Sequence, residues 1–346
     1  MIRKRILSLL CAVLTLAGML AIAWVADRVL IVKRTDGIVD MQDFYAQKEN
    51  TVDVLLLGSS HAGMNLDASV FWTEQGQSAF ALWGSVQPFW NTYHYLLEAL
   101  KTQRPRVVLL DVYAAGFDFE YSDPARQVTN VCGMRPSRNK WEAIQVSAPR
   151  ERWIDLALGL PVYHNRYAEI TADDFQHFPW TPGLINDKGT YYRYGFGAFP
   201  LTDISWVQDS VPMLEKEEIY LRKIIETCRD EQLPLVLILT PTVGPEYLQL
   251  IMNTVSGVAA EYDLPFYNFN QTWMEVGINE DDFWLDGHLN TLGARKISSF
   301  LAQMLKDRYA LPDHRGDPDY ASWDVHAETV RAEYEKLVAE AEAGPE

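Results

Sequence analysis

Short, largely apolar runs alternate along this chain with longer segments in which apolar residues recur at helical spacing. Runs of four to six such residues are typical of strands that are buried on both faces of a sheet. We expect strands of this kind at residues 54–57, 79–82, 107–112, 235–239 and 266–269.

The segments between these strands predict helices. Over residues 89–100, apolar side chains recur every three or four positions and therefore share one helical face. Further helices are expected at residues 214–232 and 245–262, and a last one begins at Thr291, directly after the capping residue Asn290. Strands that alternate with helices predict an α/β fold whose parallel sheet is covered by helices on both faces.

One long interval, residues 114–211, shows no sustained periodicity and is rich in aromatic residues, proline and glycine. A structureless stretch of this length is uncommon inside a compact domain, so we expect a cap insertion with short helices, one of them at residues 153–158. Its aromatic side chains either stack on sugar rings in a cleft or form the small core of the cap itself. They include Trp180, Tyr191, Tyr192, Tyr194 and Phe196.

The N-terminus combines a basic start with a long apolar run. Arg3, Lys4 and Arg5 precede residues 6–26, which carry no charge. At about 1.5 Å per residue the run spans roughly 30 Å, the thickness of the hydrocarbon layer of a membrane. We therefore expect a single-pass anchor in residues 1–28, with the rest of the chain outside the cytoplasm. A cleaved signal peptide is the alternative, although the run exceeds the usual apolar core of such peptides.

The anchor divides the remaining chain into three parts. Residues 29–50 carry mixed charges and are expected to form a stalk, and residues 51–312 form the folded α/β domain. Residues 313–346 are strongly acidic with scattered apolar positions, which predicts a solvated terminal helix or frayed tail.

Composition excludes some classes of function. The formal net charge of −17 argues against binding nucleic acid, because such proteins need basic surface. The three cysteines form no CxxC pair, so no metal knuckle or disulfide framework is visible. Cys11 lies in the apolar N-terminus and Cys228 on a buried helical face, which leaves Cys132 as the one candidate for an exposed thiol. We expect no metal and no cofactor.

Two polar loops carry candidate chemistry. The apolar run 54–57 ends in Gly58, Ser59 and Ser60, and ligands of open α/β sheets bind at the carboxyl ends of the strands. The second loop places Asp286 two residues before His288, ahead of the last expected helix. A serine, a histidine and a carboxylate are the parts of a nucleophilic hydrolase site. Taken separately, such a serine often only caps a helix, and such a histidine often lies in a solvated loop.

Together, the two loops resemble the motifs of the SGNH or GDSL hydrolases. Gly58, Ser59 and Ser60 match the first family block, which makes Ser60 the nucleophile, and Asp286 and His288 match the last block. The resemblance covers residues 52–311 and implies a three-layer α/β/α sandwich with a flavodoxin-like parallel sheet. The Gly-Ser-Ser variant and the membrane segment are most similar to the extracytoplasmic branch that includes the teichoic acid D-alanine transfer protein and the alginate O-acetylation proteins.

The two middle blocks of the family match unequally. The second block contributes a glycine N–H to the oxyanion hole, and Gly84 holds that place, so the resemblance implies a hole formed by the N–H groups of Ser60 and Gly84. The third block normally contributes an asparagine, but here the chain has Asp111, Val112 and Tyr113. Gln87 and Tyr113 are the candidates for an additional donor.

The resemblance implies a membrane-anchored serine esterase or O-acyltransferase that adds or removes acyl groups on a surface polysaccharide or teichoic acid. Its partner would be a membrane-embedded O-acyltransferase. The alternative is a catalytically weak, polymer-binding scaffold of a modification or export complex, which the absent asparagine and the aromatic cap would suit.

Overall fold

A five-stranded parallel sheet forms the centre of the computed structural model, which describes residues 2–33, 35–176, 186–244 and 246–343. The strands lie in the order β2-β1-β3-β4-β5. All five expected strands are present, and their ends lie within one residue of the expected positions. They are β1 (Val54–Gly58), β2 (Ala79–Trp83), β3 (Val107–Asp111), β4 (Leu235–Leu239) and β5 (Phe266–Asn268).

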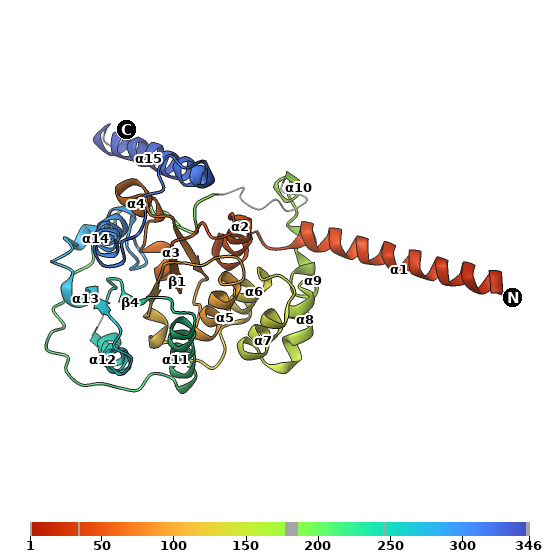
Figure 1. Cartoon of the computed structure of the whole chain (residues 1–346), viewed down its shortest axis with the longest axis horizontal. Helices are drawn as coiled ribbons and strands as arrows, with labels where there is room; N and C mark the ends of the chain where they lie inside the picture. The colour runs from red at the N-terminus through yellow and green to blue at the C-terminus, as the bar shows by residue number, and fades with distance from the viewer. Residues whose placement is uncertain (1, 34, 177–185, 245, 344–346) are drawn as a thin grey trace.

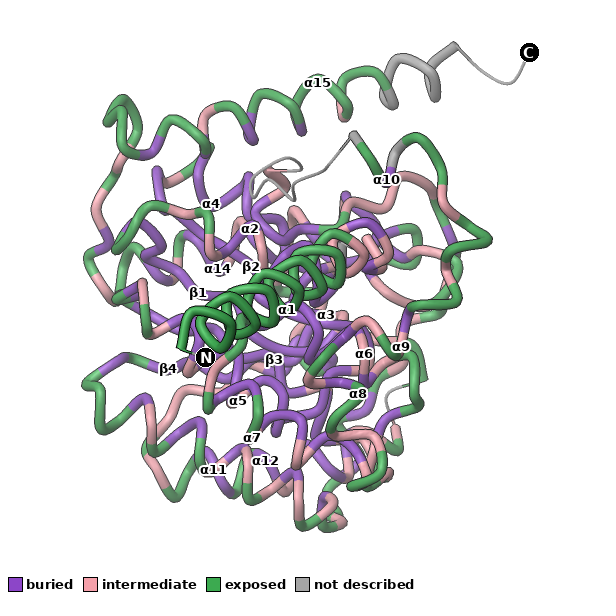
Figure 2. Tube along the Cα trace, turned by 90° about the vertical axis from the view of Figure 1, so that its right-hand side faces the viewer, coloured by how far each residue is buried: buried purple, intermediate pink, exposed green. Residues whose placement is uncertain are grey.

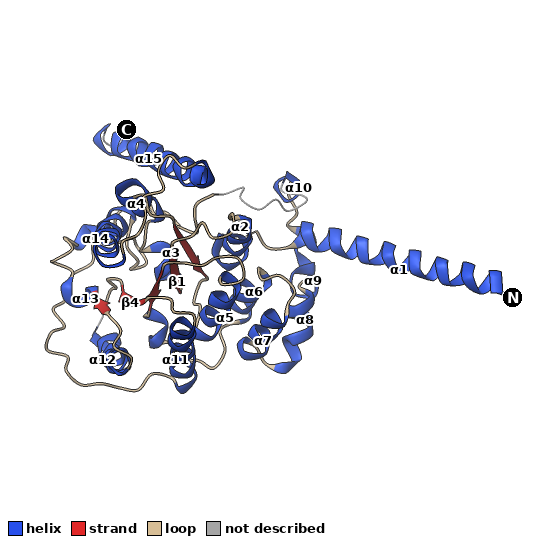
Figure 3. Ribbon diagram, viewed as in Figure 1, coloured by secondary structure: helices blue, strands red, loops and turns tan. Residues whose placement is uncertain are grey.

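Helices cover both faces of this sheet, because successive strand residues point into two separate cores. Leu55 and Leu57 pack with α5 (Phe89–Ala99), α11 (Glu215–Asp230) and α12 (Glu246–Glu261). Val54 and Leu56 pack on the other face, with helices from both ends of the domain. These are α3 (Ser60–Met64), α4 (Ala68–Gln75), α13 (Phe269–Thr272) and α14 (Thr291–Tyr309). The sheet therefore lies between two helical layers (Figures 1 and 3).

The long helices follow the expected periodicity. Helices α5, α11 and α12 end within two residues of the predicted bounds, and α14 begins at Thr291 as expected. The side chain of Asn290 accepts hydrogen bonds from the N–H groups of Leu292 and Gly293, at 3.0 and 3.1 Å. These bonds satisfy two of the free donors at the helix start, so Asn290 is the N-cap.

Helix α1 (Ile2–Leu30) projects from the domain, and its apolar residues are exposed (Figure 1). Its 29 residues, with a mean hydropathy of 2.5 over the most apolar 18-residue window, make it long and apolar enough to cross a membrane or to serve as a signal sequence. The chain that follows is tied to the domain. Arg166 donates to the backbone oxygens of Leu30 and Ile31, both at 2.8 Å, and Lys33 forms a 2.9 Å ion pair with Asp174.

The expected stalk is instead part of the folded domain. In helix α2 (Asp40–Ala46), Met41 and Phe44 are fully buried, and the Phe44 ring meets the Phe80 ring edge-on at 5.1 Å. The mixed charges of the segment suggested solvent, but these two apolar residues, three positions apart, lie on the helical face that meets the sheet. The described part of residues 29–50 is therefore no flexible tether.

The first part of the aromatic-rich interval forms a helical lobe with its own apolar core, which includes Val131, Ile144, Leu156 and Tyr163. Its expected helix at residues 153–158 is α8, with those bounds. The other described helices of the lobe are α6 (Pro124–Cys132), α7 (Arg138–Ser147), α9 (Leu160–Tyr163) and α10 (Asp173–Gln176), with a 3₁₀ segment, η4 (His164–Ala168).

One cysteine differs from expectation. Cys132 lies inside the core of the lobe and is buried, so the one cysteine that the sequence left as a candidate for exposure is not exposed. Cys11 is exposed on the surface of α1, and Cys228 is buried as expected. Burial raises the pKa of the Cys132 thiol to about 11 and that of Cys228 to about 12. Neither buried thiol is therefore ionised near neutral pH.

The acidic tail packs on the domain along its first turns. In helix α15 (Ala321–Ala343), Trp323 is only 1% exposed, and its indole N–H donates to the backbone oxygen of Ala79 at 3.1 Å. The ammonium group of Lys188 lies 3.8 Å from the centre of the Trp323 ring. The expected solvated tail is therefore wrong for this part, because the hydrogen bond from Trp323 to Ala79 fixes it to β2.

We expect Trp323→Ala to lower the free energy of unfolding by about 3–5 kcal/mol, because the substitution removes a fully buried aromatic side chain. Urea unfolding of the full chain in a mild detergent measures this difference. Val325→Ser is the matched control, since Val325 is 56% exposed on the same helix, and it should change stability by no more than about 0.5 kcal/mol. Equal effects of the two variants would contradict the packing of α15.

Candidate active site

Ser60 is displayed at the carboxyl end of β1 by a turn that requires glycine. Gly58 has φ +151°, and a Cβ atom there would lie 3.0 Å from both Cβ and the backbone oxygen of Asp111. Few residues other than glycine adopt this backbone conformation. The chain then passes through Ser59, which is buried, and enters α3 at Ser60, which is partly exposed. Of the two serines, only Ser60 is accessible.

The structure brings the three residues of the predicted site together. Oγ of Ser60 lies 2.8 Å from Nε2 of His288, although the residues are 228 positions apart. Nδ1 of His288 lies 3.1 Å from Oδ1 of Asp286, and the same oxygen accepts from the backbone N–H of His288 at 3.2 Å. A hydroxyl, an imidazole and a carboxylate therefore form one hydrogen-bonded chain, as a nucleophile, its base and an orienting group require.

Neither serine side chain caps helix α3. Ser59 holds the N-cap position but makes no capping hydrogen bond with its side chain. Its hydroxyl oxygen instead accepts from the backbone N–H of Gln87 at 3.1 Å. The helix-capping alternative for this loop is therefore wrong, and the two serines have different partners.

Arg193 adds a positive charge beside Asp286 and His288, and the sequence did not indicate it. Its guanidinium donates to Oδ1 of Asp286, the oxygen that also faces His288. Partial burial would raise the pKa of Asp286, but hydrogen bonds from Arg193 and the charge of His288 outweigh it and lower the pKa to about 2. Burial, together with the positive charge of Arg193, holds the pKa of His288 below its usual value. His288 is therefore neutral at pH 7 and can accept a proton.

Gly84 leaves the sheet beside the serine turn. The register pairs Gly58 with Trp83, so Ser59 and Gly84 follow from neighbouring strand ends. A Cβ atom at Gly84 would overlap Oδ1 of Asn130 and lie 3.0 Å from Oε1 of Gln87. Asn130, on α6, is a buried residue that the sequence did not indicate, because its helix belongs to the lobe rather than to a family motif.

The two candidates for an additional donor differ in the structure. The side-chain amide of Gln87 donates to the backbone oxygen of Gly58 and to Oγ1 of Thr92, both at 3.0 Å. Because both amide hydrogens are used, Gln87 does not fill the place of the missing asparagine. Tyr113 stacks on the ring of His61 with centroids 3.9 Å apart, and the His61 ring lies 4.9 Å from that of His288. Tyr113 therefore remains the candidate of the two.

A buried polar network holds the serine helix to the histidine loop. Asn65, at the end of α3, donates to Oγ1 of Thr240 at 2.8 Å and accepts from the backbone N–H of Leu289 at 2.9 Å. Asn65 is fully buried, and Leu289 directly follows His288. The amide of Asn65 thus links the two halves of the site. Thr240 directly follows the apolar run of β4, a position at which the sequence could have indicated it.

Asp111 extends this network beneath the site. Its carboxylate accepts from the backbone N–H groups of Tyr113, at 3.0 Å, and Thr240, at 3.3 Å. Complete burial raises the pKa of Asp111 to about 7, although these hydrogen bonds oppose the shift. Oγ1 of Thr240 also lies 3.0 Å from Nδ1 of His61, whose pKa burial lowers. Asp111, at the position where the resemblance implies an asparagine, therefore supports the ends of these loops.

The aromatic residues of the cap take different positions. Trp180 lies outside the described residues. The rings of Tyr192 and Tyr194 stack on each other. The Tyr192 hydroxyl donates a hydrogen bond to Asp67 at 2.9 Å, and the Tyr194 hydroxyl donates one to Glu333 at 2.8 Å. Tyr191 and Phe196 are 44% and 64% exposed. The described members therefore form no continuous stacking row.

Comparison with known proteins adds no family to this picture. No protein-family model matches the chain, and no curated protein sequence matches it. In the described ranges, no group of three or more histidine, cysteine, aspartate or glutamate side chains is arranged to hold a metal ion.

We expect Gly84→Ala to lower turnover about 10-fold to 100-fold without abolishing it, because the added Cβ displaces the backbone that leaves β2 beside Ser59. Steady-state hydrolysis of an aryl ester measures the effect. Complete loss of one oxyanion donor would cost about 10²–10³, and a displaced donor should cost less. Gly257→Ala is the matched control, since no heavy atom lies within 4 Å of a Cβ at that position. Unchanged turnover in Gly84→Ala would remove Gly84 from the site.

We expect Arg193→Gln to shift the acid limb of kcat/KM toward higher pH. The positive charge of Arg193 lowers the pKa of His288, so removing it raises that pKa, and His288 becomes protonated and inactive at a higher pH than in the wild type. Arg193→Lys keeps the charge and is the control. The wild-type limb should lie below the usual histidine pKa of about 6.5. A pH profile that is identical in all three proteins would contradict this role of Arg193.

Proposed function

We propose that this protein is a membrane-anchored serine esterase or O-acyltransferase of the SGNH type. The single observation that carries the proposal is the hydrogen-bonded chain from Ser60 through His288 to Asp286 at the carboxyl end of β1. The strand order 2-1-3-4-5 is the flavodoxin-like order that the family resemblance implies, within a three-layer sandwich. The position of the Asp-x-His pair ahead of the last helix of the domain supports the same family.

In the proposed reaction, Oγ of Ser60 attacks the ester carbonyl while Nε2 of His288 takes its proton. Asp286 orients the imidazole and stabilises it when it becomes charged. The backbone N–H groups of Ser60 and Gly84 are proposed to stabilise the oxyanion. His288 then protonates the departing alcohol, which leaves an acyl group on Ser60. Water or a sugar or polyol hydroxyl, deprotonated by His288, releases that acyl group.

The proposed substrate is an acylated surface polysaccharide or teichoic acid. Helix α1 would anchor the domain at the outer side of the cell membrane, where such polymers are modified. A membrane-embedded O-acyltransferase is the proposed partner, because acyl groups for extracytoplasmic transfer must cross the membrane. The net charge of −17 favours a neutral or cationic polymer, and therefore a polysaccharide over the anionic phosphate backbone of a teichoic acid.

Active-site labelling tests the proposal. A fluorophosphonate probe should modify the purified full chain once, and peptide mapping should place the label on Ser60. The same preparation should hydrolyse a small aryl ester. Labelling at Ser59 would move the nucleophile by one residue, although Ser59 is buried.

A polymer-binding scaffold is the second candidate, and the third family block favours it. Asp111 takes the position of the usual asparagine, and its carboxylate accepts hydrogen bonds from the backbone N–H groups of Tyr113 and Thr240. An oxyanion hole with one donor fewer loses about 2.7–4 kcal/mol of transition-state stabilisation. Absence of both labelling and ester turnover, together with measurable binding to a surface polymer, would favour the scaffold.

A further inference from the structure

A set of large apolar side chains is exposed around the base of α1. All four belong to the helical lobe, and their exposed fractions range from 57% to 72%: Ile154, Leu158, Tyr167 and Phe175. They lie on α8, on η4 and on α10, and we refer to this set as the lobe face. Exposed apolar side chains that gather on one side of a soluble domain indicate an interaction surface.

The sequence of α8 shows that this exposure is not incidental. Ile154 and Leu158 are four positions apart and therefore lie on one side of the helix. Leu156, between them, is fully buried in the core of the lobe. A helix that is apolar on both sides needs a second apolar environment besides the core it already covers.

The lobe face lies at the level where the apolar run of α1 ends. Oη of Tyr163, on α9, donates to the carboxylate of Asp27, and Arg166 of η4 donates to the backbone oxygens of Leu30 and Ile31. Asp27 directly follows the uncharged run. It lies three residues beyond Trp24, or about 4.5 Å along a helix at 1.5 Å per residue. Tryptophan is typical of the membrane interface, so the lobe lies within a few ångströms of the expected boundary of the bilayer.

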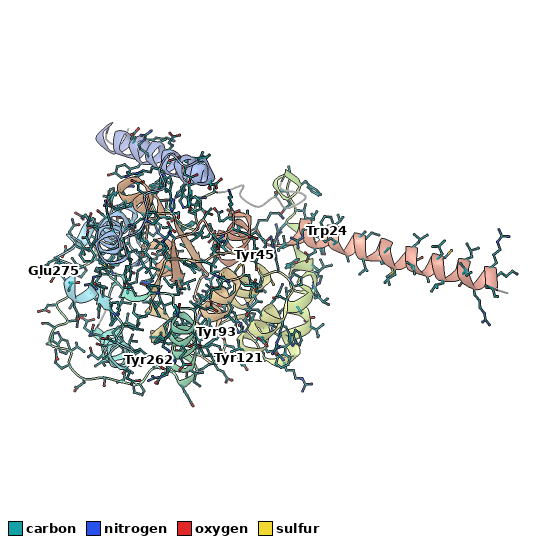
Figure 4. The ribbon with its side chains drawn as sticks, in the orientation of Figure 1. Trp24, Tyr45, Tyr93, Tyr121, Tyr262 and Glu275 are labelled. Atoms are coloured by element: carbon teal, nitrogen blue, oxygen red, sulfur yellow. The ribbon has the colours of Figure 1, made fainter. Side chains whose placement is uncertain are left out.

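The arrangement of the elements agrees with this position. Helices α8, α9 and α10 lie on the side of the domain from which α1 leaves, with α10 above and α8 and α9 below its base (Figure 1). Trp24 lies near that base, whereas Glu275 lies on the opposite side of the domain (Figure 4). Figure 2 looks at the side from which α1 projects and shows α8, α9 and α10 on it, with exposed segments.

We propose that the lobe face inserts into the headgroup region of the lipid bilayer that α1 spans, so that the domain has a fixed orientation on the membrane. This inference rests on the proposed anchoring by α1. Apolar side chains on a surface helix bury about 5–10 Å into this region. The described part of residues 29–50 packs against the domain, so the connection to α1 is short and holds the lobe close to the membrane.

The charges around the face indicate that the contact is mainly apolar. Arg150 and Arg152 precede α8, but Glu151 lies between them and Asp155 follows within the helix. With both signs present, attraction to anionic lipids adds little. Insertion of the face should therefore vary only weakly with salt concentration.

Depth-dependent quenching tests the proposal with the full chain in phosphatidylcholine nanodiscs. The test places a fluorophore on Leu158→Cys or Tyr167→Cys in a Cys11→Ser background. Its fluorescence in nanodiscs with headgroup-nitroxide lipids should be at most half of that in nanodiscs with unlabelled lipids. Met274→Cys is the control, because Met274 is 72% exposed beside Glu275, on the side away from α1. Its fluorescence should not change. Cys132 and Cys228 are buried and need no replacement.

The native Cys11 separates the two proposals, because it lies exposed on α1. A fluorophore on Cys11 that is quenched by lipids with an acyl-chain nitroxide reports insertion of α1. Quenching at Cys11 without quenching at Leu158 or Tyr167 would overturn the lobe-face proposal and leave the anchor intact. Absence of quenching at Cys11 would overturn both.

A double variant distinguishes insertion of the lobe face from mere proximity to the lipid. Ile154→Ser with Leu158→Ser should reduce the quenching at Tyr167→Cys by at least half, because the inserted apolar surface is smaller. Both side chains are exposed, so the thermal unfolding midpoint should stay unchanged. Undiminished quenching at Tyr167 in this variant would show that the face is only near the lipid and not inserted.

Discussion

Ser60→Ala and His288→Ala should each reduce kcat for an aryl ester by about 10⁴-fold to 10⁶-fold. The two side chains act as one unit, since Oγ of Ser60 lies 2.8 Å from Nε2 of His288, and removing either member leaves no activated nucleophile. The double variant should therefore be no slower than the slower single variant. Single-turnover and steady-state assays with the purified full chain measure these ratios.

Ser59→Ala is the matched control for this prediction. Its hydroxyl lies one residue from the proposed nucleophile and accepts a hydrogen bond from the N–H of Gln87. Removing it leaves a buried N–H without a partner, which costs about 1–3 kcal/mol of stability but keeps Ser60 and its base. A substantial part of the activity should remain. Loss of activity in Ser59→Ala as complete as in Ser60→Ala would contradict the assignment of the nucleophile.

The sheet and its long helices could be predicted from the sequence. Strands that are buried on both faces consist of consecutive apolar residues, and the helices show apolar residues at helical spacing. A run such as 235–239 contains only apolar residues, and the structure places its strand at those positions. The cap of α14 was likewise local, since Asn290 bonds N–H groups two and three residues ahead. Features fixed by neighbouring residues are therefore readable from the sequence alone.

Features that depend on contacts between distant residues were not predicted, because such contacts leave no pattern in the neighbouring sequence. Met41 and Trp323 lie in segments whose charges predict solvent, yet both are buried in the core beside the sheet. Arg193 comes from the aromatic-rich interval and reaches Asp286, which is 93 positions away. Nothing in the residues next to Arg193 indicates that partner.

The candidate site shows both cases. The serine, aspartate and histidine were indicated by short motifs at strand and helix ends. The supports around them depend on tertiary contacts, as the bridge from Asn65 to Leu289 over 224 positions shows. Gln87 does not replace the missing asparagine, because its side-chain amide donates to Gly58 and Thr92. The residues next to Gln87 in the sequence do not predict these contacts.

Asp286→Ala should lower kcat by about 10⁴-fold, close to the loss that removal of an orienting carboxylate produces in known serine hydrolases. The variant removes the acceptor for Nδ1 of His288 and also leaves Arg193 without its ion-pair partner. An unpaired positive charge beside His288 opposes formation of the imidazolium, so the damage has two sources. Asp286→Asn should be milder, at about 10²-fold, because every described contact of the carboxylate is to Oδ1, which an asparagine oxygen can replace.

A double variant measures the effect of the unpaired Arg193 charge by itself. In Asp286→Ala, adding Arg193→Gln removes the unpaired charge, and kcat should rise several-fold above that of Asp286→Ala alone. In the wild-type background, the same Arg193→Gln change should not raise kcat at pH 8, where His288 is already neutral. Because Arg193 and Asp286 share one contact, their effects should be non-additive, and the cycle measures that coupling. Strictly additive effects would show that Asp286 does not offset the charge of Arg193 at His288.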